Sequence, residues 1–504
     1  MKFKFILAAS ISYIYIPVFI FLFGFTKLYI ALIVSACLGF CIYKLYRDYN
    51  NEICGGGCGD KFRFPLWTVL FCVLILFIYG YYMGFGGFAP QKGDWGKHNA
   101  VLNDLVVHQW PVYYKNGNEM SMLTYYLAQY LVSALAGKIA NSFNVAEIVQ
   151  YIWNVYGIFL VFINIIIFLN MYGNKKKIYT GLFILLFFSG ALYFAQAAAY
   201  FIYGDRMDCL DDRYWLMGQN FNIQLRSNMI SLMWTFPQWI VPCLASSLLF
   251  RFKNHVKHYV TLLMPLMLFA SLSFIGILPA VIIYALYMQV KSKDIKYLKN
   301  IFSIENIISF LSLGIVLLFY FYGNVFMEKP AEIGFHITNY GNEILAYFIF
   351  CFFMFGFHSL LIRKKYKNDC LFYMVNITLM LLPLFSMGLW NDLVMGGGTA
   401  LMFLLMMYIM DFLFNSEKTK PYYKARRILV VLLLAGAIYP LLELKEVINN
   451  DIITEKQEDL SLGYTMESYA NRALDISLDL KYNYYSYDIQ NNIFYKYIAA
   501  KKYE

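Results

Sequence analysis

Long apolar runs separated by short polar stretches dominate the chain. Runs of roughly 20 residues, the length that crosses the hydrocarbon core of a bilayer, begin near Ile6, Tyr29, Pro65, Ala146, Ile178, Met229, Ile301, Ile344, Leu371, Thr399 and Ile428. The runs at 122–140 and 260–290 are ambiguous. The pattern predicts an all-α, polytopic integral membrane protein. Its first run is too long for a signal peptide, and we expect it to be retained as a span.

Basic segments lie between many of these runs and orient them, because Lys and Arg concentrate in cytoplasmic loops. These basic segments are 44–63, 175–177, 251–257, 291–299, 363–367 and 418–427. Together with Lys2 and Lys4 they contain 25 of the 41 basic residues. We expect all of them on the cytoplasmic side. The alternation of crossings then places residues 84–121 and 444–504 outside.

The same rule resolves the two ambiguous runs. Only one crossing fits between the outer segment 84–121 and the lysines at 175–177, so 122–140 is expected to lie along the outer surface as an interfacial helix. Basic segments flank 260–290 on both sides, so this run should enter and return as two short helices with a turn near Phe274–Gly276. The prediction is about 13 crossings in a transmembrane domain 1–443, a first outer loop at 84–146 and a short outer tail at 444–504.

Composition excludes an ordinary soluble enzyme. The chain is 60% apolar and 14% charged, against about 45–50% and about 25% in soluble domains. Its net charge of +10 is explained mainly by the basic loops, so no nucleic-acid partner is expected. The spans are nearly free of ionisable groups, which argues against an ion-coupled transporter. Polar residues gather instead in three outer connections.

The first outer connection contains GDWGKHNAVLNDLVVHQW. If this stretch is helical, a mostly polar stripe recurs at spacings of three or four residues along one face. Its members are Asp94, Lys97, His98, Val101, Asp104 and His108, with Trp110 just beyond. Such a group can deprotonate a hydroxyl and hold a phosphate. A solvated amphipathic helix at the level of the lipid headgroups is the alternative interpretation.

The second connection, 204–227, is rich in Asp and Arg. Its carboxylates are able to hold a divalent metal through oxygen ligands, or the arginines neutralise them without one. Arg226 lies nearest the next run and is the best candidate there for binding an anion. In the third connection, Asn391 and Asp392 precede Gly396–Gly398. Consecutive glycines can expose backbone N–H groups to a phosphate, and they also suit turns and close helix packing.

These features together resemble the GT-C glycosyltransferases, polytopic enzymes that take a sugar from a polyprenyl-phosphate carrier. The resemblance rests on a span ending near Met83, Asp94 followed by Lys97 and His98, and WPVYY leading into an aromatic interfacial helix. Later segments similar to the same group are WTFPQW (234–239), NDLVM (391–395) and FYKYIAAK near the end. The resemblance implies transfer of the sugar to a glycan or lipid acceptor at the outer face of a bacterial cytoplasmic (inner) membrane, among membrane lipids.

The resemblance also implies roles for individual residues. Asp94 is the expected base on the acceptor hydroxyl. The expected donor-phosphate ligands are Lys97, His98, Arg226 and Gln238, and the supporting residues are Asp104, His108, Trp110, Asn391 and Asp392. Many members have a second acid after the first, where this chain has Trp-Gly, so metal dependence stays open and no cofactor is assigned. Gly396 stands where a basic residue is expected, which weakens the case for NDLVM as a phosphate clamp.

Two other functions fit the same features. An O-antigen or capsule polymerase or ligase also uses a lipid-linked donor at an outer active site. A non-catalytic transporter or scaffold for a lipid-linked glycan belongs to a different class of protein and needs no base at Asp94.

Overall fold

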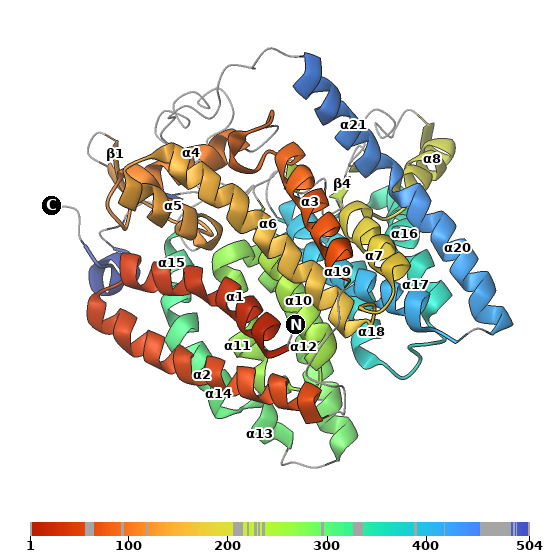
Figure 1. Cartoon of the computed structure of the whole chain (residues 1–504), viewed down its shortest axis with the longest axis horizontal. Helices are drawn as coiled ribbons and strands as arrows, with labels where there is room; N and C mark the ends of the chain where they lie inside the picture. Colours follow the sequence, from red (N-terminus) through yellow and green to blue (C-terminus); the bar gives the residue numbers. More distant parts are fainter. Residues whose placement is uncertain are drawn as a thin grey trace.

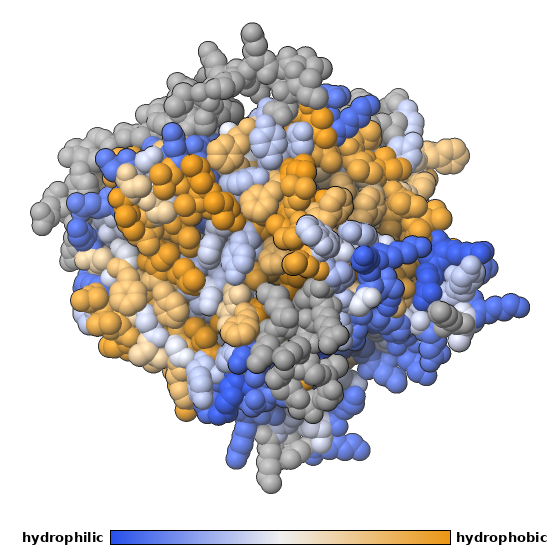
Figure 2. All heavy atoms as spheres, viewed as in Figure 1, coloured by the Kyte–Doolittle hydropathy of each residue, from blue (hydrophilic) through white to orange (hydrophobic). Residues whose placement is uncertain are grey.

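The computed structural model describes residues 3–55, 65–91, 95–116, 119–204, 215–218, 221–225, 229, 232–233, 237–293, 297–325, 336–387, 391–417, 419–453, 485–486, 489 and 491–501. Helices dominate, and most of them run side by side in one bundle (Figure 1). Figure 2 shows a broad hydrophobic surface across the middle of the bundle and hydrophilic side chains along its lower and right-hand edges. An apolar surface of this extent needs lipid around it.

Within the described residues, eight helices are long and apolar enough to cross a membrane. Five of them are single helices, namely α1 (Phe3–Phe25), α2 (Leu28–Gly55), α6 (Phe143–Phe168), α12 (Leu266–Ser292) and α19 (Asp392–Asn415). The other three are stretches made of consecutive helices. Leu298–Tyr322 contains α13 (Leu298–Ile301), α14 (Ile304–Ser309) and most of α15 (Ile315–Val325); Gly341–Ile362 contains α16 (Ile344–Cys351) and α17 (Phe357–Ile362); and Lys420–Asn449 contains α20 (Lys420–Gly436) and most of α21 (Ile438–Ile453). The chain is therefore a multi-pass integral membrane protein.

A ninth span is formed if α7 (Lys175–Phe187) and α8 (Leu192–Tyr203) are taken as one helix bent by 44°. Three apolar helices are shorter, namely α3 (Leu66–Tyr82), α10 (Ile240–Phe252) and Cys370–Leu384, which includes α18 (Cys370–Leu381). Eight or nine spans are what the described residues support. The total of about 13 stays a prediction.

The chain between Phe252 and Ser292 leaves one end of the bundle and returns to it. The short α11 (Tyr259–Leu263) leads into α12, which is broken at Ala270 by φ/ψ of −161°/80°. The Tyr284 hydroxyl then donates to Asn254 Oδ1 at 2.9 Å, so the two ends of the excursion lie together. The turn is at Ala270 and not at the predicted Phe274–Gly276, and the returning arm is a long helix rather than a short one.

The basic segments gather at one end of the bundle. Ion pairs join α2 to the segment after α10 through Asp48–Lys257 at 2.7 Å, and α19 to the turn after α17 through Asp411–Lys365 at 2.6 Å. Lys177 Nζ donates to the Phe414 carbonyl at 2.8 Å. We call this the basic end. That it faces the cytoplasm stays a prediction from the distribution of Lys and Arg.

The opposite end carries the first outer connection and the end of the chain. It contains α4 (Trp95–Val107), α5 (Ala128–Ala140) and a small antiparallel sheet of order β1–β2–β7, with β1 at Tyr113–Asn116, β2 at Glu119–Leu123 and β7 at Tyr485–Ser486. Strand β7 pairs with β2 through Leu123 and Tyr485. Strand β7 is part of the tail, 444–504, so this pairing joins the tail to the first connection. We call this the site end.

Two further hairpins, β3 (Trp215–Gly218) with β4 (Phe221–Gln224) and β5 (His336–Ile337) with β6 (Phe385–Ser386), add to the helices. The expected all-α fold thus includes small strands. The run at 122–140 is also shorter as a helix than predicted. Its first residues end β2, and α5 begins only at Ala128 and is not among the candidate spans.

Candidate functional site

Helix α4 lies inside the protein, although its sequence is strongly polar. All of its residues from Trp95 to Val106 are buried except Lys97, which is half-buried. The buried polar members are His98, Asn99, Asn103 and Asp104. A solvated amphipathic helix would expose these side chains, so that interpretation is wrong for the described residues. Buried polar groups cost free energy and are characteristic of functional sites or of specific packing.

His98 is held between α4 and α5. Its Nδ1 hydrogen-bonds with the hydroxyl of Tyr130, and the side chain is only 1% exposed. Burial lowers the pKa of His98 well below its usual value, and the nearby Lys97 charge acts in the same direction. His98 is therefore neutral at physiological pH. It can donate or accept a hydrogen bond, but it does not offer a positive charge to a phosphate.

Asp104 contacts the small sheet, and His108 lies beside Asp104. Asp104 is fully buried, and its Oδ2 accepts a hydrogen bond from the Tyr114 hydroxyl at 2.7 Å. His108 Nε2 lies 4.0 Å from the other carboxylate oxygen, one turn further along the helix. The predicted polar stripe is thus divided, with Lys97 at one end of α4 and the Asp104–His108 pair at the other.

Trp110 closes the C-terminal end of α4. Its Nε1 donates to the Leu105 carbonyl at 2.8 Å, and its ring stacks on Phe25 at 5.5 Å between ring centres. Lys138 of α5 lies over the Trp110 ring and donates to the Val106 carbonyl at 3.1 Å. A cation at a helix C-terminus interacts favourably with the helix dipole. Trp110 therefore packs this end of the structure, and Lys138 is a residue that the motif analysis did not single out.

Four segments far apart in the sequence meet around Tyr126, between β2 and α5. The Tyr126 hydroxyl lies close enough to the side chains of Tyr125 and Gln238, and to the charges of Lys97 and Asp392, for all four to affect its pKa. Burial raises the pKa of Tyr126 to about 12, Asp392 adds to the increase, and Lys97 opposes it. Three predicted residues, Lys97, Gln238 and Asp392, are thereby brought together. Tyr126 was missed, because one tyrosine among 45 carries no distinguishing signal.

Gln238 has a buried oxygen at this meeting point. The side chain is 3% exposed, and its Oε1 has no hydrogen-bond partner within the described part of the chain. An isolated buried acceptor of this kind calls for a physical explanation, and a ligand hydroxyl or an ordered water provides one. We call Lys97, Tyr126, Gln238 and Asp392 the Tyr126 cluster.

Neighbouring contacts position the cluster. Trp95 Nε1 donates to the Met233 carbonyl at 2.8 Å and so holds the start of α4 against the segment that precedes Gln238. Asn391 adopts a left-handed conformation, with φ of 51°, directly before α19, and Asp392 lies in the first turn of that helix. The start of α19 therefore turns sharply at the cluster.

The triple glycine serves close packing rather than phosphate binding. Gly396–Gly398 lie inside α19 and are buried, and a Cβ atom placed on Gly276 of α12 would lie 2.2 Å from the Gly397 carbonyl oxygen. Ser273 Oγ also donates to the Gly396 carbonyl at 2.7 Å. These contacts bring the two helix backbones together, so the packing interpretation of the glycines is correct.

Other predicted site residues lie outside the described residues. They are Asp94, Arg226 and the acidic and basic residues at 205–213. Where side chains are described, no group of three or more His, Cys, Asp or Glu residues is arranged to hold a metal ion. A divalent metal in the second connection stays a prediction.

No family model, no curated protein and no solved structure matches the chain. The resemblance to GT-C glycosyltransferases is therefore not supported by these comparisons. The class that the helices define is a multi-pass integral membrane protein. Its buried polar cluster at the site end is the basis for any functional assignment.

Proposed function

We propose that the chain is a membrane glycosyltransferase, which moves a sugar from a polyprenyl-phosphate donor to a glycan or lipid acceptor outside the cytoplasm. The observation that carries the proposal is the Tyr126 cluster with the buried Gln238 Oε1. A cation, a carboxylate, a hydroxyl and an available amide oxygen gathered beside apolar helices suit a ligand with a phosphate, hydroxyl groups and a lipid chain.

Each group has a role in this proposal. Lys97 balances the charge of the donor phosphate, and Gln238 accepts a hydrogen bond from a sugar hydroxyl. The neutral His98 is a hydrogen-bonding group that helps to hold α4 in place through Tyr130. Asp94 comes directly before α4 and takes the proton from the acceptor hydroxyl. Arg226 and Asp392 complete the polar surroundings of the donor.

The finer topology belongs to the same proposal. About 13 crossings, counted with roughly 20 residues for each, place the site end outside the cytoplasm in a bacterial inner membrane. The contact of the tail with β2 and of Tyr113 with the Lys501 carbonyl at 2.6 Å supports a common side for the first connection and the tail. A polymerase or ligase that uses the same donor would differ in making a chain of repeating units.

One observation favours a transporter of a lipid-linked glycan instead. The break between α7 and α8 lies against a π-helical stretch, Phe352–Gly356, and the Ala191 N–H donates to the Phe353 carbonyl at 3.1 Å. His358 follows this stretch, is fully buried, and its ring nitrogens have no hydrogen-bond partner in the described structure. Broken helices and buried ionisable residues within spans are features of transport pathways.

The deciding experiment replaces Asp94 by Asn, which cannot accept the proton. Transfer of radiolabelled sugar from polyprenyl phosphate in membranes should fall about 10²–10⁴-fold, the usual contribution of a general base, while donor binding is retained. Glu417→Gln, an exposed acid at the basic end, is the control for loss of one carboxylate. Wild-type turnover by Asp94→Asn would remove Asp94 as the base.

A second variant tests the donor site. Lys97→Ala should weaken binding of the polyprenyl-phosphate donor about tenfold, because a hydrogen bond to a charged group contributes about 1.5–3 kcal/mol. Lys501→Ala removes an exposed lysine from the same end of the molecule and should leave binding unchanged. Movement of intact donor across reconstituted vesicles, without sugar transfer, would favour the transporter.

A further inference from the structure

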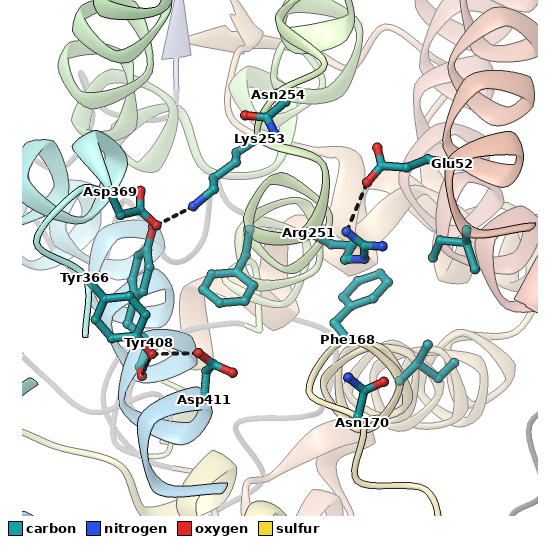
Figure 3. Close-up of a pocket in the computed structure, with 13 residues that line it drawn as sticks. Glu52, Phe168, Asn170, Arg251, Lys253, Asn254, Tyr366, Asp369, Tyr408 and Asp411 are labelled. Atoms are coloured by element: carbon teal, nitrogen blue, oxygen red, sulfur yellow. Dashed lines mark hydrogen bonds and ion pairs between the residues drawn. The ribbon is translucent and has the colours of Figure 1, made fainter. Parts of the chain in front are cut away.

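A cavity of about 460 Å³ lies at the basic end, and none of its lining residues belongs to the Tyr126 cluster. Figure 3 shows side chains from several helices pointing into it. One part of its wall is apolar and includes Ile53, Ile167, Phe168 and Phe250. A neighbouring cavity of about 480 Å³ is lined by some of the same residues, Lys253, Asn254, Tyr366 and Asp369. Each volume is within the range of small-molecule sites.

The carboxylates of this cavity are already supplied with donors. Asp369 pairs with Lys253 and accepts from the Tyr408 hydroxyl at 3.1 Å. Asp411 accepts from Lys365 at 2.6 Å and from the Tyr366 hydroxyl at 2.7 Å. Glu52 is held by Arg251 at 3.0 Å and also by His255. Of the six oxygens of these three carboxylates, only Asp369 Oδ1 has no donor among the described residues.

Donors, in contrast, are in excess on α10 and the turn that follows it. A guanidinium has five N–H groups and an ammonium three. Among the described residues, Arg251 makes one hydrogen bond, from Nη1 to Glu52, and Lys253 makes one, to Asp369. Asn254 Oδ1 accepts from Tyr284, and its amide N–H₂ group has no acceptor in the described part of the chain. In Figure 3 these three side chains border the same space.

Among the described residues, the spare donors outnumber the single free carboxylate oxygen, Asp369 Oδ1, and this excess favours an anion with several oxygen atoms. Guanidinium and ammonium groups are the usual ligands of phosphate in proteins. The apolar wall at Phe168 and Phe250 adds a surface for a hydrophobic or aromatic part of the same molecule. Within the described structure, a small cation would have only one open carboxylate oxygen, Asp369 Oδ1, as a ligand, and it would make no contact with the apolar wall.

We propose that this cavity binds a phosphate-bearing ligand, with phosphate oxygens accepting hydrogen bonds from Arg251, Lys253 and Asn254 and with an apolar or aromatic group against Phe168 and Phe250. Two sources share this chemistry, an anionic phospholipid headgroup and a soluble nucleotide. The proposal is independent of the glycosyltransferase assignment, because it concerns the other end of the molecule and none of the residues of the Tyr126 cluster.

The test uses the full-length protein in detergent after removal of bound lipid. Native mass spectrometry follows binding of phosphatidylglycerol and of a diacylglycerol with the same acyl chains and no phosphate, and calorimetry follows binding of AMP. We expect phosphatidylglycerol, AMP or both to bind and diacylglycerol not to bind. Binding of phosphatidylglycerol alone identifies a lipid site, and binding of AMP alone identifies a soluble ligand.

The variants Arg251→Gln and Lys253→Gln should each lower that affinity about tenfold. Glu52 keeps His255 in the first variant, and Asp369 keeps Tyr408 in the second, so neither acid loses all of its donors. Lys364→Gln removes an exposed charge nearby and should bind as the wild type does. Binding of neither phosphate compound, or binding unchanged in both cavity variants with wild-type melting midpoints, would overturn the proposal.

Discussion

The two ends of the molecule use their charged residues differently. At the basic end, carboxylates on α2 and α19 form direct ion pairs with cations on other segments, as in Asp48–Lys257 and Asp411–Lys365. At the site end, hydroxyl and amide groups surround the charged residues. Tyr114 donates to the buried Asp104, and Tyr126 lies under the influence of both Lys97 and Asp392.

This difference separates charges that hold helices together from charges that are suited to act on a ligand. A direct ion pair contributes modest net stability, because desolvation offsets much of the attraction, but it fixes which helix ends meet. Charges that shift the pKa of a shared, half-buried hydroxyl are a feature of functional sites. The comparison places the proposed sugar transfer at the site end, and the helix-joining ion pairs together with the proposed phosphate site at the basic end.

The largest effect on folding is expected where α12 and α19 meet beneath the site. Gly276→Ala places a Cβ atom 2.2 Å from the Gly397 carbonyl oxygen, and two helix backbones must separate to admit it. Overpacking of this kind costs about 1–3 kcal/mol. The midpoint of thermal unfolding and sugar transfer should both fall. Gly39→Ala, in an open position on α2 with no atom within 4 Å of the new Cβ, is the matched control and should be neutral or stabilising.

Asp411→Asn tests whether the two ends of the molecule have separate roles. The variant loses the charge that pairs with Lys365 but keeps an oxygen for Tyr366, so we expect a loss of about 1–2 kcal/mol in unfolding free energy. Donor binding at the far end should be unchanged. Thermal unfolding together with a donor-binding assay measures both. If donor binding fell with stability unaltered, the division of roles between the ends would be incorrect.

The smallest effect concerns pH. Because burial lowers the pKa of His98 in the folded protein, the unfolded chain binds the proton first as the pH falls below about 6.5. Stability should therefore be fully present above that pH and decline below it, by at most about 1.4 kcal/mol per pH unit for one proton. His98→Gln should flatten this part of the pH profile. A pH profile of His98→Gln that matches the wild-type profile below about 6.5 would contradict this prediction.

The class of the protein was predictable from the sequence, because the energy of crossing a membrane is a sum over neighbouring residues. Apolar runs located α1, α2, α6 and α19, and the Lys and Arg segments identified the helix ends that gather at the basic end. The excursion between Asn254 and Tyr284 was also predicted, since its two basic flanks required a return. Its turn at Ala270 was not, because a single change of backbone dihedrals has no hydropathy signal.

The candidate site depended on contacts between distant segments. The motif around Asp94 identified Lys97 and His98, but the sequence did not distinguish a buried α4 from a solvated one, since what covers a polar helix lies elsewhere in the chain. Tyr126 became notable only because Gln238 and Asp392, more than 100 residues away in sequence, fold against it. Local composition determined where the chain enters the membrane, and long-range packing alone decided which polar side chains meet, because hydropathy is local and a binding site is not.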